Sequence, residues 1–170
     1  MGLPVPEETR VEVQLSDKAA TEVLAARLAP LLRRGDVVAL SGGLGAGKTA
    51  FCRALINALP GPAEEVPSPT FTLAQVYERG DRQVWHFDFY RLKDPDEVWE
   101  LGLEEALAEG ISLIEWPERL GSQLPRDRLD LHLATPLADA AHEQTRLATL
   151  CGQGAWAARL AAQAQELAGP

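Results

Sequence analysis

The residues best suited to chemistry run from Gly42 to Thr49 and read GGLGAGKT. They fit the pattern G-x-x-x-x-G-K-[ST], in which glycines let the backbone curl closely around phosphate groups. The N–H groups of such a loop point at the phosphates, Lys48 adds a mobile cation, and the Thr49 hydroxyl is a ligand for Mg²⁺. The pattern therefore predicts a phosphate site formed by Gly43, Leu44, Gly45, Ala46, Gly47, Lys48 and Thr49.

The expected nucleotide is ATP rather than GTP. Guanine-specific proteins with this loop recognise the base through an Asn-Lys-x-Asp segment. The only asparagine in the chain is Asn57, and Ala58 follows it. We therefore expect ATP and Mg²⁺ as cofactors.

A second Mg²⁺ ligand is expected at Glu115. Phosphate loops need a carboxylate near the metal, usually at the end of a neighbouring buried strand, and residues 111–114 form a short apolar run that ends in Glu115. The alternative is a strand-end glutamate that faces solvent. Direct and water-mediated contact with the metal both remain open.

Asp88 is the other candidate catalytic acid. In WHFDFYR, strand alternation places His86, Asp88 and Tyr90 on one face and aromatic side chains on the other. If that face borders the phosphates, Asp88 orients the metal or the attacking water, and Arg91 answers charge on the γ-phosphate. The alternative is a structural Asp–Arg pair. His86 is interpreted as a structural histidine.

Ser68-Pro69-Thr70 has the position of a switch segment. It follows the helix after the phosphate loop at a distance that lets the connector return over the nucleotide, with Thr70 sensing the γ-phosphate. The alternative is a proline turn that begins the next strand.

These residues need strands and helices to position them. Residues 37–40 predict a strand covered on both faces, and residues 50–59 a helix. A strand is expected at 11–15. It precedes a helix that is capped by Ser16 or Asp17 and extends to Leu31, with Gly35 just beyond its end. Further strands are expected at 71–77, 83–89, 112–114, 129–134 and 146–151, with a tight turn at 79–81, and helices at 94–101, 104–108 and 155–167.

The pattern predicts an α/β fold of the P-loop NTPase type, with a mixed β-sheet flanked by helices. We expect residues 1–170 to form a single P-loop ATPase domain, with residues 1–9 as a flexible N-terminus. The chain has 170 residues, the size of one ordinary domain.

Composition narrows the classes of partner. With 46% hydrophobic and 24% charged residues and no long apolar run, the chain is expected to be cytoplasmic, with no membrane partner. A net charge of −9 disfavours direct binding to nucleic acid without a partner protein. The two cysteines, Cys52 and Cys151, are expected to be ordinary buried thiols.

Five motifs together resemble the TsaE (YjeE) family: LSGGLGAGKT, SPTFTL, HFDFYRL, LGLEEAL and IEWPERL, in the same order and at similar spacing. The resemblance covers roughly residues 11–160. It implies a P-loop fold and a role in making threonylcarbamoyladenosine beside the anticodon of tRNA. It also implies an ATP hydrolase that is slow alone, acts with TsaD and TsaB, and meets tRNA indirectly through that complex.

The resemblance also implies roles for individual residues. It makes Lys48 the phosphate lysine, Thr49 and Glu115 the Mg²⁺ ligands, Asp88 the acid of the HFDxYR motif and Thr70 the switch threonine. It implies further nucleotide contacts at Trp116, Glu118, Ser16, Lys18 and Arg146. The chain departs from some relatives before the last strand, where it reads His142-Glu143-Gln144 instead of having a basic residue there.

Two other functions stay open at this point. The LGAGKT loop also resembles small-molecule and nucleotide kinases, although the connector at 60–69 carries no arginine for a lid. The other possibility is an ATP-dependent assembly module with negligible hydrolysis.

Overall fold

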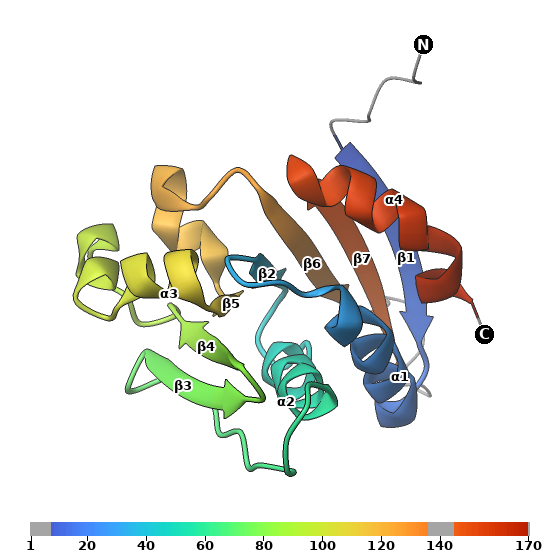
Figure 1. The fold of residues 1–170 in the computed structure, drawn as a ribbon, viewed down its shortest axis with the longest axis horizontal. Helices are drawn as coiled ribbons and strands as arrows, with labels where there is room; N and C mark the ends of the chain where they lie inside the picture. The colour runs from blue at the N-terminus through green and yellow to red at the C-terminus, as the bar shows by residue number, and fades with distance from the viewer. Residues whose placement is uncertain (1–7, 136–144, 170) are drawn as a thin grey trace.

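A seven-stranded mixed sheet organises the molecule, with strand order β1-β7-β6-β2-β5-β4-β3 (Figure 1). The computed structural model describes residues 8–135 and 145–169. Strands β6, β2, β5 and β4 are parallel, whereas β7, β1 and β3 pair antiparallel with their neighbours. The strands are β1 (Glu8–Leu15), β2 (Val37–Ser41), β3 (Ala74–Arg79), β4 (Arg82–Asp88), β5 (Ile111–Glu115), β6 (Arg128–Ala134) and β7 (Arg146–Gln153).

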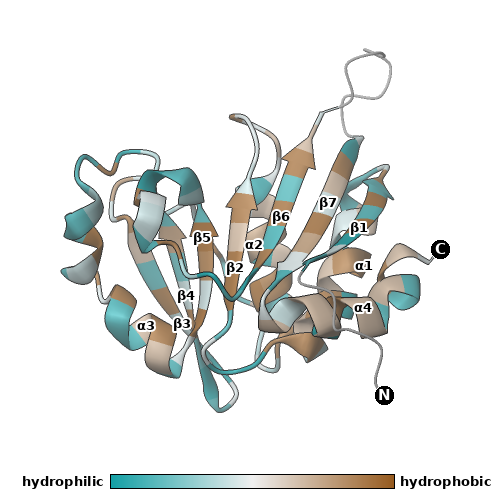
Figure 2. Cartoon of the chain, turned by 90° about the horizontal axis from the view of Figure 1, so that it is seen from above, coloured by the Kyte–Doolittle hydropathy of each residue, from teal (hydrophilic) through white to brown (hydrophobic). Residues whose placement is uncertain are grey.

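Helices cover both faces of the sheet. They are α1 (Lys18–Leu28), α2 (Lys48–Ala58), α3 (Leu103–Glu109) and α4 (Ala155–Ala168), with 3₁₀ turns η1 (Ala29–Leu31), η2 (Pro95–Trp99) and η3 (Pro117–Gln123). The larger core lies under α1, α2 and α4, and a smaller one packs α3, η2 and η3 on Trp85 and Phe87 of β4. In Figure 2 apolar colouring runs along the central strands. Both predictions of the fold class, a mixed sheet and flanking helices, are confirmed.

Burial explains why β2 and β5 read as continuous apolar runs. Every residue of β5 and the first four of β2 are buried, because helices cover both sides of these strands. In β6 buried leucines alternate with more exposed residues, as expected where only one face is covered. No helix among the described residues is long and apolar enough to cross a membrane.

The ends of the parallel strands meet at one edge of the sheet. Glu115, the last residue of β5, pairs with Leu40 of β2 on one side and with Asp88, the last residue of β4, on the other. The phosphate loop begins immediately after β2, at Gly42. This edge therefore brings together three motifs that are far apart in the sequence.

The N-terminal prediction needs one correction. Strand β1 begins at Glu8, so Glu8 and Thr9 do not belong to a flexible terminus. They pair with Gln153 and Gly152 of β7, and the Thr9 hydroxyl donates to the carbonyl oxygen of Ala157 at 2.7 Å. A long partner strand holds them in the sheet.

Some element boundaries also differ from the prediction. Residues 71–73 form a turn before β3, because the N–H of Leu73 donates to Pro69 O at 2.7 Å and Leu73 has a φ of 66°. The segment after Asp94 is 3₁₀ rather than α-helical and ends at Trp99. Of the two predicted caps for α1, Asp17 is the one that accepts from the N–H of Ala20. The turn η3 was not predicted.

Candidate nucleotide-binding site

Local backbone geometry shapes the phosphate loop between β2 and α2. Gly47 has a φ of 103° and leads directly into α2 at Lys48. A side chain at Gly42 would place its Cβ 2.5 Å from the carbonyl oxygen of Leu133, and the φ of 143° there also favours glycine. The loop can take this path against β6 only because position 42 is a glycine.

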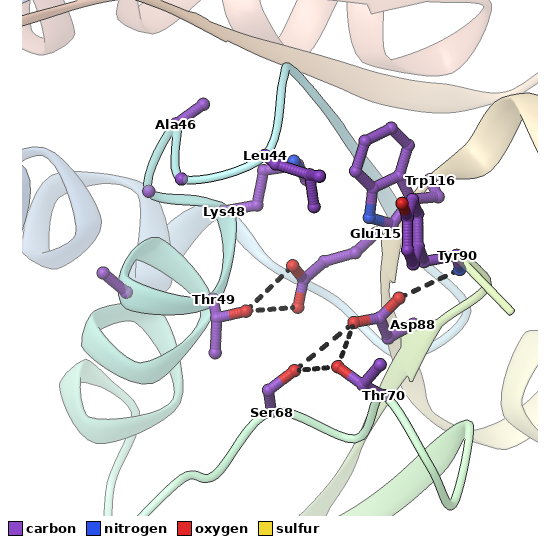
Figure 3. Close-up of a pocket in the computed structure, with 13 residues that line it drawn as sticks. Leu44, Ala46, Lys48, Thr49, Ser68, Thr70, Asp88, Tyr90, Glu115 and Trp116 are labelled. Atoms are coloured by element: carbon purple, nitrogen blue, oxygen red, sulfur yellow. Dashed lines mark hydrogen bonds between the residues drawn. The ribbon is translucent and has the colours of Figure 1, made fainter.

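A cavity of about 340 Å³ opens between the phosphate loop and the strand ends (Figure 3). Its lining combines backbone of the loop with polar side chains from three other segments. The lining residues are Leu44, Gly45, Ala46, Gly47, Lys48, Thr49, Ala50, Ser68, Thr70, Asp88, Tyr90, Glu115 and Trp116. Residues 44–49 of the predicted loop, both predicted acids and Thr70 therefore lie around one cavity, whereas Gly43 does not line it.

Lys48 supplies a buried cation to this cavity. Its Nζ donates to the carbonyl oxygens of Gly42 and Gly43, both at 2.8 Å, and lies 4.1 Å from the centre of the Trp116 ring. The residue is 5% exposed. Burial lowers the pKa of Lys48, while the nearby carboxylates of Glu115 and Asp88 act in the opposite direction. The ammonium group is thus poorly hydrated, and a phosphate would replace its lost water.

Glu115 and Thr49 are in direct contact. The Thr49 hydroxyl lies within hydrogen-bond distance of both Glu115 carboxylate oxygens, at 2.9 Å from Oε1 and 3.1 Å from Oε2. Glu115 is 2% exposed, so the alternative of a solvent-facing glutamate does not hold. A buried carboxylate beside a hydroxyl is an all-oxygen donor pair of the kind that Mg²⁺ prefers.

Asp88, at the end of β4, contacts the segment Ser68–Thr70 between α2 and β3. Its Oδ2 accepts from the hydroxyls of Thr70 at 3.2 Å and Ser68 at 3.4 Å, and its Oδ1 accepts from the N–H of Tyr90 at 3.0 Å. The hydroxyls of Ser68 and Thr70 are themselves 2.7 Å apart, and Figure 3 shows this group facing the Thr49–Glu115 pair. Arg91 packs on the Phe71 ring instead, with its Cζ 4.7 Å from the ring centre.

A second cavity, of about 720 Å³, adjoins the first on the other side of the loop. Ala46, Gly47 and Ala50 line both cavities, and Lys18 and Arg146 line the second. Arg146 also donates to two loop carbonyls, from Nε to Ala46 O at 3.1 Å and from Nη2 to Gly45 O at 3.2 Å. A molecule with its phosphates in the loop has room for a base and sugar here. The sequence departure at residues 142–144 lies outside the described residues.

Of the three remaining residues predicted to contact the nucleotide, one lines a cavity and two do not. Trp116 has a φ of 59°, lines the first cavity and packs on Tyr90 with ring centres 4.9 Å apart. Glu118 is exposed on η3 and does not line either cavity, although its charge acts on the pKa of Lys48. Ser16 is exposed and lines neither cavity, although its neighbours Leu15 and Asp17 line the second one.

His86 is the residue that the sequence reasoning missed. Its Nε2 lies 2.6 Å from Glu115 Oε2, and the side chain is fully buried. Since a carboxylate only accepts hydrogen bonds, Nε2 carries the proton in this contact. The available signal was strand alternation, which placed His86 on the face of Asp88, but only the pairing of β4 with β5 shows that this face meets Glu115.

The fold and this site define a P-loop NTPase-like protein. More specifically, the chain belongs to the TsaE family: the family model described as "Threonylcarbamoyl adenosine biosynthesis protein TsaE" matches residues 15–144. The recognition of this family from the five motifs is thereby confirmed.

Individual relatives agree with the family match. Proteins named "tRNA threonylcarbamoyladenosine biosynthesis protein TsaE" are similar to this chain. The one from Rickettsia felis is 43% identical, covering 70% of this chain and 70% of the relative. The one from Streptomyces coelicolor is 42% identical, covering 77% and 89%. A crystal structure of YdiB from Bacillus subtilis superposes with a TM-score of 0.71 at 28% identity, covering 94% of this chain and 95% of that one.

Proposed function

We propose that this protein binds ATP with Mg²⁺ and hydrolyses it in the biosynthesis of threonylcarbamoyladenosine on tRNA. The observation that carries the ATPase part is the Thr49–Glu115 contact, at 2.9 Å, beside the buried ammonium group of Lys48. The biosynthetic part rests on membership of the TsaE family, whose relatives are named for that process.

The donor set fits the expected cofactors. The cavity offers two neighbouring oxygen ligands, Thr49 and Glu115, and a lysine whose described hydrogen bonds go to backbone carbonyls. When bound, Mg²⁺ supplies charge neutralisation on the β- and γ-phosphates. Glu115 and Thr49 would hold the ion, and Lys48 would exchange its carbonyl partners for phosphate oxygens.

Asp88 and Thr70 would act on the γ-phosphate side of the cavity. Asp88 is buried at the end of β4, one strand from Glu115, and accepts from Thr70. A carboxylate in this place can orient the attacking water, and the Thr70 hydroxyl can turn from Asp88 to the nucleotide. Both side chains already line the cavity.

The second cavity would hold the base and sugar. Lys18 and Arg146 line it, and Arg146 ties the cavity wall to the loop through Ala46. We therefore assign adenosine contacts to Lys18 and Arg146 rather than to Ser16. Trp116 would remain beside the phosphates through its contact with Lys48.

TsaD and TsaB are the expected protein partners, and tRNA would be reached through them in the cytoplasm. A net charge of −9 opposes direct binding to a phosphate backbone, because such binding depends on Lys and Arg. An acidic ATPase that acts on a protein complex avoids this repulsion.

The test is ATP hydrolysis by the purified protein, alone and with TsaB, TsaD and substrate tRNA, with Lys48→Met as the inactive control. We expect slow release of phosphate alone and faster release with the partners. Phosphate transferred to a small acceptor would identify a kinase instead. Binding without turnover in any mixture would identify an assembly module.

A further inference from the structure

Three potential metal ligands of different chemistry converge behind the Thr49 hydroxyl. Cys52 of α2, His86 of β4 and Glu115 of β5 each place one ligand atom so that all three atoms lie within 4.8 Å of one another. Cys52 and His86 are 0% exposed and Glu115 is 2% exposed. The cluster therefore joins three elements at a single buried point.

The helix and strand geometry explains how these side chains reach the cluster. Cys52 follows Thr49 by three residues in α2, so both side chains lie on the helix face directed at the strand ends. His86 reaches the same point from β4 through its contact with Glu115. The His86 ring also has its Nδ1 buried without a hydrogen-bond partner in the part of the chain that the structure describes, so the ring is not fully satisfied by the protein.

We propose that Cys52, His86 and Glu115 form a binding site for a thiophilic divalent cation such as Zn²⁺. Sulfur, imidazole nitrogen and carboxylate oxygen are the three donors that Zn²⁺ uses, whereas Mg²⁺ prefers oxygen alone. With the metal–ligand lengths usual for zinc, tetrahedral donors lie about 3.3–3.6 Å apart. The His86–Glu115 contact must therefore open from 2.6 Å, and the three ligand atoms already lie within 4.8 Å of one another.

The proposed site meets the cavity at one of its three ligands. Glu115 lines the cavity of about 340 Å³, whereas Cys52 and His86 are buried and do not line it, so an ion would enter past the Glu115 carboxylate. A water molecule from the cavity would complete the four ligands. On binding, the metal–sulfur bond replaces the S–H bond of Cys52 and the thiol proton passes to solvent, while the His86 ring proton moves from Nε2 to Nδ1 so that Nε2 can bind the metal.

The consequence for activity rests on the proposed function. The thiophilic ion would compete with Mg²⁺ for Glu115, because the same oxygen, Oε2, lies 3.1 Å from the Thr49 hydroxyl and 2.6 Å from His86 Nε2. Occupation of the Cys52 site would therefore inhibit hydrolysis that depends on Mg²⁺. Inhibition by micromolar Zn²⁺ in the presence of millimolar Mg²⁺ is the expected behaviour.

The direct test uses Co²⁺ as a coloured substitute for Zn²⁺, and it does not depend on ATPase activity. We expect titration of the intact protein to give thiolate-to-cobalt charge-transfer absorption that Zn²⁺ abolishes. Cys151→Ser is the matched control, since Cys151 is the only other cysteine and lies on β7.

The Cys151→Ser variant should keep the absorption, while Cys52→Ser and Cys52→Ala should lose it. His86→Gln should weaken the affinity at least tenfold. No absorption in the wild type, or full absorption in folded Cys52→Ser, overturns the proposal.

Measurements of ATP hydrolysis with and without Zn²⁺ test the metal site separately from the proposed function. Cys52→Ser should keep the basal hydrolysis and become resistant to Zn²⁺, while Cys151→Ser stays sensitive. Equal Zn²⁺ inhibition of wild type and Cys52→Ser would assign the inhibition to other ligands and contradict the proposal. If the wild type hydrolyses no ATP, the proposed function fails, and the cobalt titration still decides the metal site.

Discussion

At the scale of single residues, the Glu115 carboxylate is held from two sides. Thr49 contacts it at 2.9 Å from α2, and His86 contacts it at 2.6 Å from β4. A histidine that fixes a metal-ligating carboxylate limits its rotation, and loss of such a partner typically costs 10–100-fold in metal affinity. His86 therefore acts as a positioning residue for the proposed Mg²⁺ site.

Substitution of His86 tests this positioning role. We expect His86→Leu to raise the Mg²⁺ concentration needed for half-maximal hydrolysis by about tenfold or more. His86→Gln should have a smaller effect, because its amide can still donate to Glu115. Nucleotide affinity without Mg²⁺ should stay unchanged in both folded variants. An unaltered Mg²⁺ requirement in His86→Leu would show that the contact is structural only.

Lys48 is expected to serve nucleotide binding rather than the stability of the fold. Its burial lowers the pKa, so the folded protein carries a poorly solvated ammonium group. We expect Lys48→Met to unfold with a free energy within about 1 kcal/mol of the wild type, or above it, because the lost hydrogen bonds are offset by relief of desolvation. The measurement is chemical denaturation without nucleotide, with the exposed Lys93→Met as control. A loss well beyond this range would mean that Lys48 stabilises the empty fold.

At the scale of elements, the strand–loop–helix unit depends on one close approach. The Cβ of an alanine at position 42 would meet Leu133 O at 2.5 Å, whereas at position 43 nothing lies within 4 Å. We expect Gly42→Ala to lower the free energy of unfolding by about 1–3 kcal/mol through strain. Gly43→Ala should change it by less than about 0.5 kcal/mol. Equal stability of the two variants in urea denaturation would refute the steric role of the β6 carbonyl.

This unit was predictable from the sequence because its signals are local. The apolar run of β2, the glycine loop and the breaker-free α2 follow one another within about 20 residues. Other segments were not predictable in this way, because tertiary contacts decide their backbone conformation. Residues 71–73 have strand-like side chains, yet the contact between Leu73 and Pro69 turns them. The capping pattern at Asp94 was read as an α-helix, and the segment forms a 3₁₀ turn.

At the scale of the whole molecule, the candidate site is a product of topology. The sequence indicated Glu115 and Asp88 as separate strand-end acids, and the order β2-β5-β4 makes them neighbours. Strand order has no local signal, so neither the His86–Glu115 contact nor the Cys52 cluster was predictable from one sequence.

The same topology divides the proposed nucleotide between two cavities. The parallel strand ends provide the phosphate and metal ligands, while α1, α2 and the start of β7 enclose the second cavity. Ala46, Gly47 and Ala50 lie between the two. Binding of ATP would thus connect both halves of the sheet edge.

The most direct test of the account is calorimetric titration of ATP into the wild type, with and without Mg²⁺, beside Lys48→Met and Glu115→Gln. We predict saturable binding that Mg²⁺ strengthens in the wild type and that Lys48→Met loses. Glu115→Gln should keep the affinity measured without Mg²⁺ and lose the strengthening. Wild-type affinity in Lys48→Met, or an undiminished Mg²⁺ effect in Glu115→Gln, would contradict the assignment of this cavity as a site for ATP with Mg²⁺.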